Sequence, residues 1–161
     1  MNIAIVGLGA MGGLIAAQLI QAGHQVKALA RGQTLSAVRQ GGLTLEQAGQ
    51  QIKLPLKVSD QVRELGQHDL VIVAVKAPAL PQLAEAIAQL RADNGVVLTA
   101  MNGVPWWFFQ GFSGPCKDVR LRSVDPDASL DRAIPREALL GSVLHMSAST
   151  PSPGHVLHAM G

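Results

Sequence analysis

The sequence predicts an α/β fold of the Rossmann type, with a doubly wound, mainly parallel sheet that has helices on both faces. Two observations predict it. The chain starts with a strand–helix–strand pattern that has glycines at its first turn, and buried strands then alternate with helices. The 161 residues are enough for one core and too few for two ordinary domains, so we expect a single domain over 1–161.

The amino-terminal unit carries a nucleotide-binding pattern. Residues 2–6 are apolar and β-prone, Leu and Ile recur at helical spacing over 14–20, and residues 25–30 read as a second strand. Between the first strand and the helix stands G-x-G-x-x-G, whose glycines allow a tight turn, close approach of a pyrophosphate and close helix packing. The start of the helix favours phosphate through its free N–H groups and dipole. A turn without a ligand is the alternative. The predicted dinucleotide site comprises Gly7, Leu8, Gly9, Ala10, Met11 and Gly12.

The end of the second predicted strand indicates which dinucleotide is bound. A site for NAD usually has an acid there to hold the ribose 2′-hydroxyl. This chain has Arg31 and no acid between Gln21 and Leu45. An arginine pairs well with a phosphate. We therefore predict NADP(H), with Arg31 as the ligand of the 2′-phosphate; an ordinary solvated arginine is the alternative.

The remaining elements follow from periodicity and from glycine and proline positions. Helices are predicted over 34–40, 60–65, 78–91 and 127–132, the third with Leu80, Leu83, Ile87 and Leu90 on one face. Residues 43–45 and 51–54 predict a hairpin with Gly49 near its turn. Strands are predicted over 69–75, 95–101 and 139–146, and a further strand starts at 156–159. The Ser, Thr and Pro residues of 147–153 predict a loop.

Two polar residues follow predicted strands. Lys76 ends one strand and Asn102 ends another, and ligands of open parallel sheets lie beyond the carboxyl ends of the strands. We therefore expect both side chains in the same crevice as Gly9; a solvated lysine and a turn-forming Asn-Gly are the alternatives. The aromatic segment 105–109 packs in the core or forms a wall that faces the site or a partner domain, and we favour the wall because the rest of the core is aliphatic.

Composition excludes several classes of protein. The net charge is +2 without a basic stripe, which argues against nucleic-acid binding, and no apolar run approaches a membrane span. Cys116 is the single cysteine, which favours a reducing, cytoplasmic compartment. His145, His155 and His158 fit no metal motif, so we predict no metal site.

With these residues assembled, the sequence resembles the ketopantoate reductase (2-dehydropantoate 2-reductase) family. The matching segments are GLGAMGG at 7–13, Arg31, VKA at 75–77, NGV at 102–104, GSVLHMS at 141–147 and PGHVLH at 153–158. The resemblance implies NADPH-dependent reduction of 2-dehydropantoate to (R)-pantoate on the way to pantothenate and coenzyme A. It also implies roles for single residues. Lys76 would contact the cofactor near its nicotinamide, Asn102 would contact both cofactor and substrate, and Ser147 would be a small cofactor-contacting residue.

The resemblance also implies a departure. Members of the family are longer and carry a second, helical domain, which holds the proton-donating lysine and most substrate contacts. We expect this chain to lack that domain and to contain no catalytic residue of its own. We therefore expect it to bind NADP(H) with little or no turnover, and to self-associate through exposed apolar surface.

Two other functions remain open. The segments GLGAMG and QAGHQV are also similar to β-hydroxyacid dehydrogenases, although VKA and NGV differ from that family's turns. The chain is alternatively a non-enzymatic NADP-binding module. Which small 2-keto acid serves as the substrate is not determined by these residues.

Overall fold

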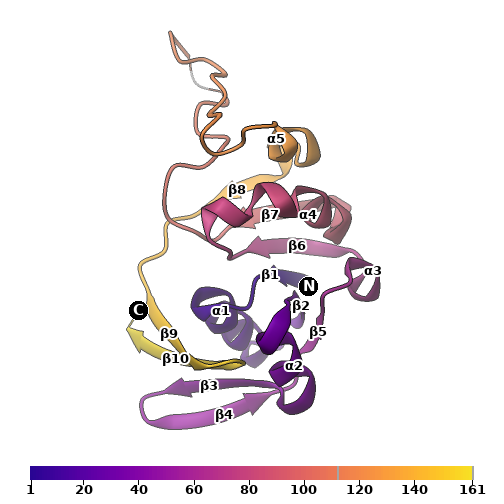
Figure 1. Cartoon of the computed structure of the whole chain (residues 1–161), viewed down its shortest axis with the longest axis vertical. Helices are drawn as coiled ribbons and strands as arrows, with labels where there is room; N and C mark the ends of the chain where they lie inside the picture. Colours follow the sequence, from indigo (N-terminus) through magenta and orange to yellow (C-terminus); the bar gives the residue numbers. More distant parts are fainter. Residues whose placement is uncertain (112, 161) are drawn as a thin grey trace.

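The strands of the computed structural model, which describes residues 1–111 and 113–160, form two sheets (Figure 1). The large sheet has six strands in the order β5-β2-β1-β6-β7-β8, and every neighbouring pair is parallel. Its strands are β1 (Asn2–Val6), β2 (Gln25–Leu29), β5 (Lys57–Ser59), β6 (His68–Val73), β7 (Arg91–Thr99) and β8 (Leu139–Gly141). The chain runs outward from β1 through β2 and β5, then returns to β6 on the other side of β1. The predicted doubly wound parallel sheet is confirmed.

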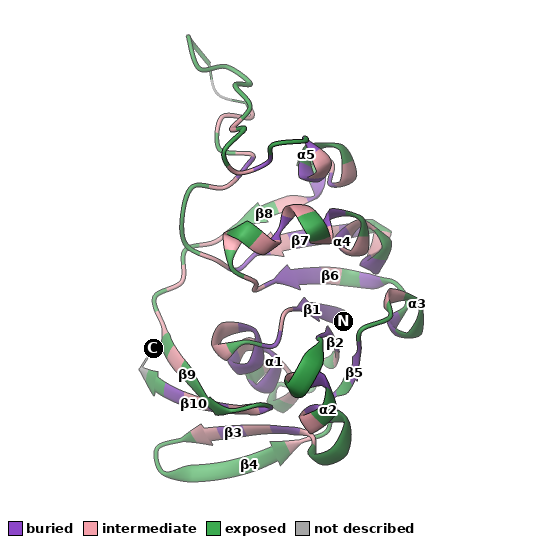
Figure 2. Cartoon of the chain, in the orientation of Figure 1, coloured by how far each residue is buried: buried purple, intermediate pink, exposed green. Residues whose placement is uncertain are grey.

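Helices cover both faces of the large sheet, as predicted. They are α1 (Ala10–Gln21), α2 (Gly32–Gly41), α3 (Val62–Leu65), α4 (Ala84–Leu90) and α5 (Ser129–Ala133). Side chains alternate along β1, so Ile3 and Ile5 join the core under α1 and α2, while Ala4 and Val6 join the core under α3, α4 and α5. Figure 2 shows most of β1 and β6 as buried, as expected for strands covered on both faces.

The small sheet has four strands in the order β4-β3-β10-β9. They are β3 (Leu43–Gln47), β4 (Gln50–Leu54), β9 (Ser147–Ser152) and β10 (His155–Met160). The hairpin β3–β4 confirms the prediction for 43–54, and β10 adds to it in parallel from the far end of the chain. Helix α1 lies between the two sheets (Figure 1). The helix packs closely there, since a Cβ at Gly13 would lie 2.4 Å from Val156 Cγ2.

Three predicted elements differ from the structure. The helix over 78–91 is confirmed only for α4, since two 3₁₀ turns, η1 (Ala77–Ala79) and η2 (Pro81–Leu83), replace its first half. Pro81 has no N–H and its ring clashes with the preceding turn of a helix, which disfavours a regular helix through this position. The strand over 139–146 ends at Gly141, after which the chain crosses from the large sheet to the small one.

The predicted loop over 147–153 is the third error, because residues 147–152 form the edge strand β9. An edge strand tolerates Pro151, whose missing N–H can point away from the sheet. Strand β5 has no sequence signal, since it has only three residues and pairs with β2 through tertiary contact.

A third 3₁₀ turn, η3 (Arg136–Ala138), precedes β8. It follows the long segment between β7 and α5, which is mostly exposed or half-buried (Figure 2). Buried Asp125 fixes the end of that segment, because its carboxylate accepts hydrogen bonds from the backbone N–H groups of Leu130 and Asp131 at 3.3 and 3.1 Å. The same carboxylate accepts a third hydrogen bond, from the Ser129 hydroxyl.

Candidate functional site

The turn from β1 into α1 is built around two glycines that the backbone itself requires. Gly7 has φ +93°, a conformation that favours glycine, and a Cβ there would lie 2.5 Å from Val75 Cγ1. A Cβ at Gly12 would lie 1.9 Å from the carbonyl oxygen of Gly7. The roles predicted for these two glycines, a tight turn and close helix packing, match this geometry.

Gly9 differs from both. It is the N-cap of α1, with φ −76° and ψ −165°, which other residues adopt readily. A Cβ at Gly9 would have no atom of the described chain within 4 Å. The glycine therefore leaves open space above the first turn of α1, where the unpaired N–H groups of a helix start are exposed.

Three contiguous cavities lie along the carboxyl ends of the large sheet's strands. The central cavity has a volume of about 680 Å³ and is lined by Gly9, Lys76 and Asn102 among others. The Arg31 cavity, of about 470 Å³, shares Gly7, Gly9 and Arg31 with it. A third cavity of about 380 Å³, which we call the tryptophan cavity, contains Trp106 and Trp107.

The fold thus brings together predicted site residues from four separate segments. Gly7, Gly9, Ala10, Met11, Arg31, Lys76 and Asn102 all line the central cavity. Leu8 lines the Arg31 cavity, and Gly12 is buried beneath the turn. Ser147 is exposed at the start of β9 and is not among the residues that line these three cavities, although Leu144 and Met146 line the central one.

The Arg31 cavity is lined by three polar residues that the sequence reasoning missed, Thr34, Asp60 and Gln82. Arg31 is the exposed N-cap of α2, and Thr34 from the first turn of that helix also lines the cavity. Asp60, the residue after β5, lines it too, and its carboxylate lies 3.8 Å from the Arg39 guanidinium. Asp60 was missed because β5 itself has no sequence signal, so nothing placed residue 60 beside the end of β2.

Asn102 is held by backbone groups of the crossing segment 142–146. Its Nδ2 donates to the carbonyl oxygen of Leu144 at 3.1 Å, and its Oδ1 accepts from the Leu144 N–H at 2.9 Å. The amide is therefore fixed in one orientation, and these two bonds leave one N–H and one Oδ1 lone pair unused by Leu144. Lys76, the exposed N-cap of η1, lines the same cavity.

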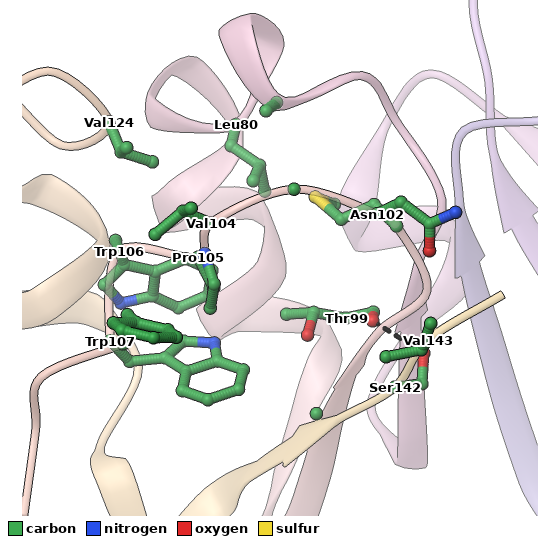
Figure 3. A pocket seen from close by; sticks show the side chains of 15 residues that line it. Leu80, Thr99, Asn102, Val104, Pro105, Trp106, Trp107, Val124, Ser142 and Val143 are labelled. Atoms are coloured by element: carbon green, nitrogen blue, oxygen red, sulfur yellow. Dashed lines mark hydrogen bonds between the residues drawn. The ribbon is translucent and has the colours of Figure 1, made fainter.

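The aromatic segment divides between core and cavity. Trp106 combines the two alternatives, because it is 3% exposed and packs with Leu130 and Ile134 while one side of it lines the tryptophan cavity. Trp107 and Phe108 also line this cavity, and Phe108 is 40% exposed. Figure 3 shows the two indole rings on one side of this cavity and Thr99 and Val143 on the other.

Among the described residues, no group of three or more His, Cys, Asp or Glu side chains is placed to hold a metal ion. His155 Nε2 instead lies 2.9 Å from the Glu46 carboxylate, between the neighbouring strands β10 and β3. Cys116 is exposed. Over the same described part of the chain, no helix has the length and apolar character needed to cross a bilayer.

Comparison with known proteins gives consistent results. The family model described as "Ketopantoate reductase PanE/ApbA" matches residues 3–106. The chain is 38% identical over 162 residues to a 2-dehydropantoate 2-reductase of Mesorhizobium japonicum, covering 100% of this chain and 50% of that protein. The chain therefore spans about half the length of that relative.

Solved structures give the same picture. A crystal structure from Ralstonia solanacearum MolK2, assigned provisionally to the ketopantoate reductases, has a TM-score of 0.93 and 46% identity over 99% of this chain and 49% of that one. A PanE/ApbA family ketopantoate reductase from Ralstonia eutropha JMP134 has a TM-score of 0.77 and 26% identity, over 98% of this chain and 46% of that one.

Proposed function

Given that the chain belongs to the ketopantoate reductase family, we propose that it binds NADP(H) along the central and Arg31 cavities and takes part in the reduction of 2-dehydropantoate to (R)-pantoate. The family and its oxidoreductase chemistry rest on the matching family model and on the relative named 2-dehydropantoate 2-reductase. The cofactor, the substrate and the residue roles are the proposal.

The observation that carries the proposal is the open space at Gly9. Gly7 and Gly12 are required by the chain's own packing, whereas a Cβ at Gly9 would meet nothing within 4 Å. At the start of α1, this open space lets a ligand approach the backbone closely. The position, at the start of a twelve-residue helix, suits a pyrophosphate.

The Arg31 cavity supports the phosphorylated dinucleotide. Arg31 and the start of α2 present a guanidinium, the Thr34 side chain and free helix N–H groups to one place, and α2 has no acidic residue in its first turn. A 2′-phosphate would gain charge-assisted hydrogen bonds there. Asp60 opposes this preference, but its charge is partly offset by Arg39.

The substrate end of the crevice lies at Lys76 and Asn102. NADPH would supply the hydride for reduction of the ketone. Asn102, fixed by Leu144, would orient the cofactor and the substrate oxygen, and Lys76 would contact the cofactor near its nicotinamide. We propose that the proton comes from a group outside these 161 residues. Because a positioned acid raises the rate by about 10²- to 10⁴-fold, this chain alone would bind the cofactor with little turnover.

Calorimetric titration of the chain with NADPH and NADH, followed by an NADPH oxidation assay with 2-dehydropantoate, tests the proposal. We expect NADPH to bind more tightly than NADH and oxidation to be slow or absent. Failure of NADPH to bind to folded chain would refute the cofactor assignment. Rapid oxidation would instead refute the external proton source and the alternative of a non-enzymatic binding module.

A further inference from the structure

The tryptophan cavity is a formed hollow beyond the cofactor crevice. Its volume of about 380 Å³ lies within the range of about 300–1,000 Å³ typical of small-molecule sites. Thr99 at the end of β7, the loop that follows it, Leu80 and the Ser142–Val143 segment enclose it (Figure 3).

The cavity continues directly from the central cavity. Ala77, Met101 and Asn102 line both. Gly9 and Arg31 lie in the central cavity but not in the tryptophan cavity, so the three cavities follow one another from Arg31 to Trp107. A molecule that reacts at the Asn102 end of the cofactor crevice would therefore have this hollow beside its reacting carbon.

The lining favours an apolar group. Trp107, Phe108 and Met101 line the hollow, and Val104 and Val143 at its surface are 58% and 72% exposed. The two hydroxyls present are used internally, since Thr99 Oγ1 donates to the Leu140 carbonyl at 3.3 Å and Ser142 Oγ donates to the Thr99 carbonyl at 2.9 Å. They do not offer a free donor to a ligand.

Two unused donors remain. The indole nitrogens of Trp106 and Trp107 are buried and have no hydrogen-bond partner within residues 1–111 and 113–160. A buried donor without a partner is costly and uncommon in native proteins. A ligand atom with a lone pair, at the end of an otherwise apolar group, would give such a donor a partner.

We propose that the tryptophan cavity is the subsite for the side chain of the 2-oxo acid, and that it selects apolar side chains larger than methyl, aromatic ones included. This assignment rests on the proposed function, which places the reacting ketone at Asn102. It goes further by naming the residues that choose the substrate, with Trp107 and Phe108 as the aromatic wall.

The chain provides its own reporter for a test. Trp106 and Trp107 are its two tryptophans, and both line the cavity. Their two indole N–H signals in a ¹H–¹⁵N spectrum are followed while the chain is titrated with pyruvate and, separately, with 2-oxo-4-phenylbutanoate, each with and without NADP⁺. Since each buried methylene is worth about fourfold in affinity, we expect the phenyl acid to shift both signals with an affinity at least about tenfold higher than that of pyruvate.

A matched pair of variants locates the effect. Phe108→Ala removes the aromatic wall and should weaken the phenyl acid by at least about fivefold while leaving pyruvate unchanged. Val119→Ala, at a 45% exposed residue of the same long segment that does not line the cavity, should change neither. Equal affinities for the two acids, or an unaltered affinity in Phe108→Ala, would overturn the subsite.

The titrations with NADP⁺ distinguish failure of the proposed function from failure of the side-chain subsite. The backbone amide signal of Gly9 reports on the cofactor crevice. If NADP⁺ shifts this signal and the two acids still bind equally, the side-chain subsite alone is refuted. If NADP⁺ binds nowhere on the folded chain, the proposed function fails and the substrate assignment fails with it.

Discussion

The carbonyl oxygen of Gly7 occupies the place that a side chain on Gly12 would need, since a Cβ at Gly12 would lie 1.9 Å from that oxygen. Helix α1 therefore sits directly on the turn that leads into it. The first turn of α1 lines the central cavity next to Gly9.

This relationship predicts different outcomes for two alanine substitutions in one motif. Gly12→Ala forces α1 away from β1 and should lower the free energy of unfolding by about 1–3 kcal/mol or more, as overpacking does. Gly9→Ala should leave stability nearly unchanged but weaken NADPH binding by at least about tenfold, because the methyl group fills space left for the pyrophosphate. Urea unfolding and calorimetry measure the two effects, and equal stability losses would contradict the division of roles.

Cofactor preference should depend on Arg31 and Asp60 in opposite directions. Arg31→Asp replaces a phosphate-pairing cation by an anion and should reverse the preference for NADPH over NADH. Asp60→Asn removes an opposing charge from the same cavity and should strengthen NADPH binding more than NADH binding. The ratio of the two dissociation constants is the measurement; an unchanged ratio in Arg31→Asp would remove that residue from the 2′-phosphate site.

The Asn102 amide should hold the crossing segment in place. Asn102→Ala loses both hydrogen bonds to Leu144 and should lower the free energy of unfolding by about 1 kcal/mol. Hydrogen exchange at the Leu144 amide should accelerate in this variant. Asn94→Ala, at an exposed position on β7, is the control. If the Leu144 amide stays protected in Asn102→Ala, the side chain does not fix the segment.

Stability should fall in mild acid because of His68. This residue is 2% exposed at the start of β6, and burial is the main cause that lowers its pKa from the ordinary 6.5, with the positive charge of Lys27 acting in the same direction. Hydrogen bonding of the ring to the Leu90 carbonyl and the charge of Asp69 act against that shift.

The direction in which stability changes with pH follows from proton uptake by the unfolded chain. Below about pH 6.5 the unfolded chain binds a proton at residue 68 that the folded chain does not, so stability declines by up to about 1.4 kcal/mol per pH unit until the folded-state pKa is reached. Urea unfolding between neutral and acidic pH measures the slope. His68→Leu should flatten it, whereas His145→Gln, at an exposed residue, should not. Equal slopes in the three proteins would contradict this account.

Some elements could be predicted from the sequence because a few neighbouring residues determine them. The glycine spacing at residues 7–12 and the apolar run of β1 predicted the turn from β1 into α1, because that turn depends on neighbouring residues only. The carboxyl-end rule then placed Lys76 and Asn102 beside Gly9, since parallel strands end at one edge. The hairpin of β3 and β4 was predictable for the same local reason.

Other features depend on residues far apart in the chain. Nothing near Ser147 predicts that it begins a strand, because β9 exists only through pairing with β10, which itself pairs with β3 more than a hundred residues earlier. Asp60 enters the Arg31 cavity only because three residues of β5 pair with β2.

The sequence by itself determined the fold class, the carboxyl-end side of the sheet as the place of the candidate site, and the turn around Gly9, since short-range periodicity and backbone sterics act within a few residues. Only the tertiary structure decided that a second sheet covers α1 and that Asn102 fixes the segment 142–146. It also decided that Trp106 packs in the core and lines a cavity together with Trp107 and Phe108. The physical reason is that burial and hydrogen bonding stabilise surfaces that are in contact. Which surfaces come into contact depends on the path of the whole chain.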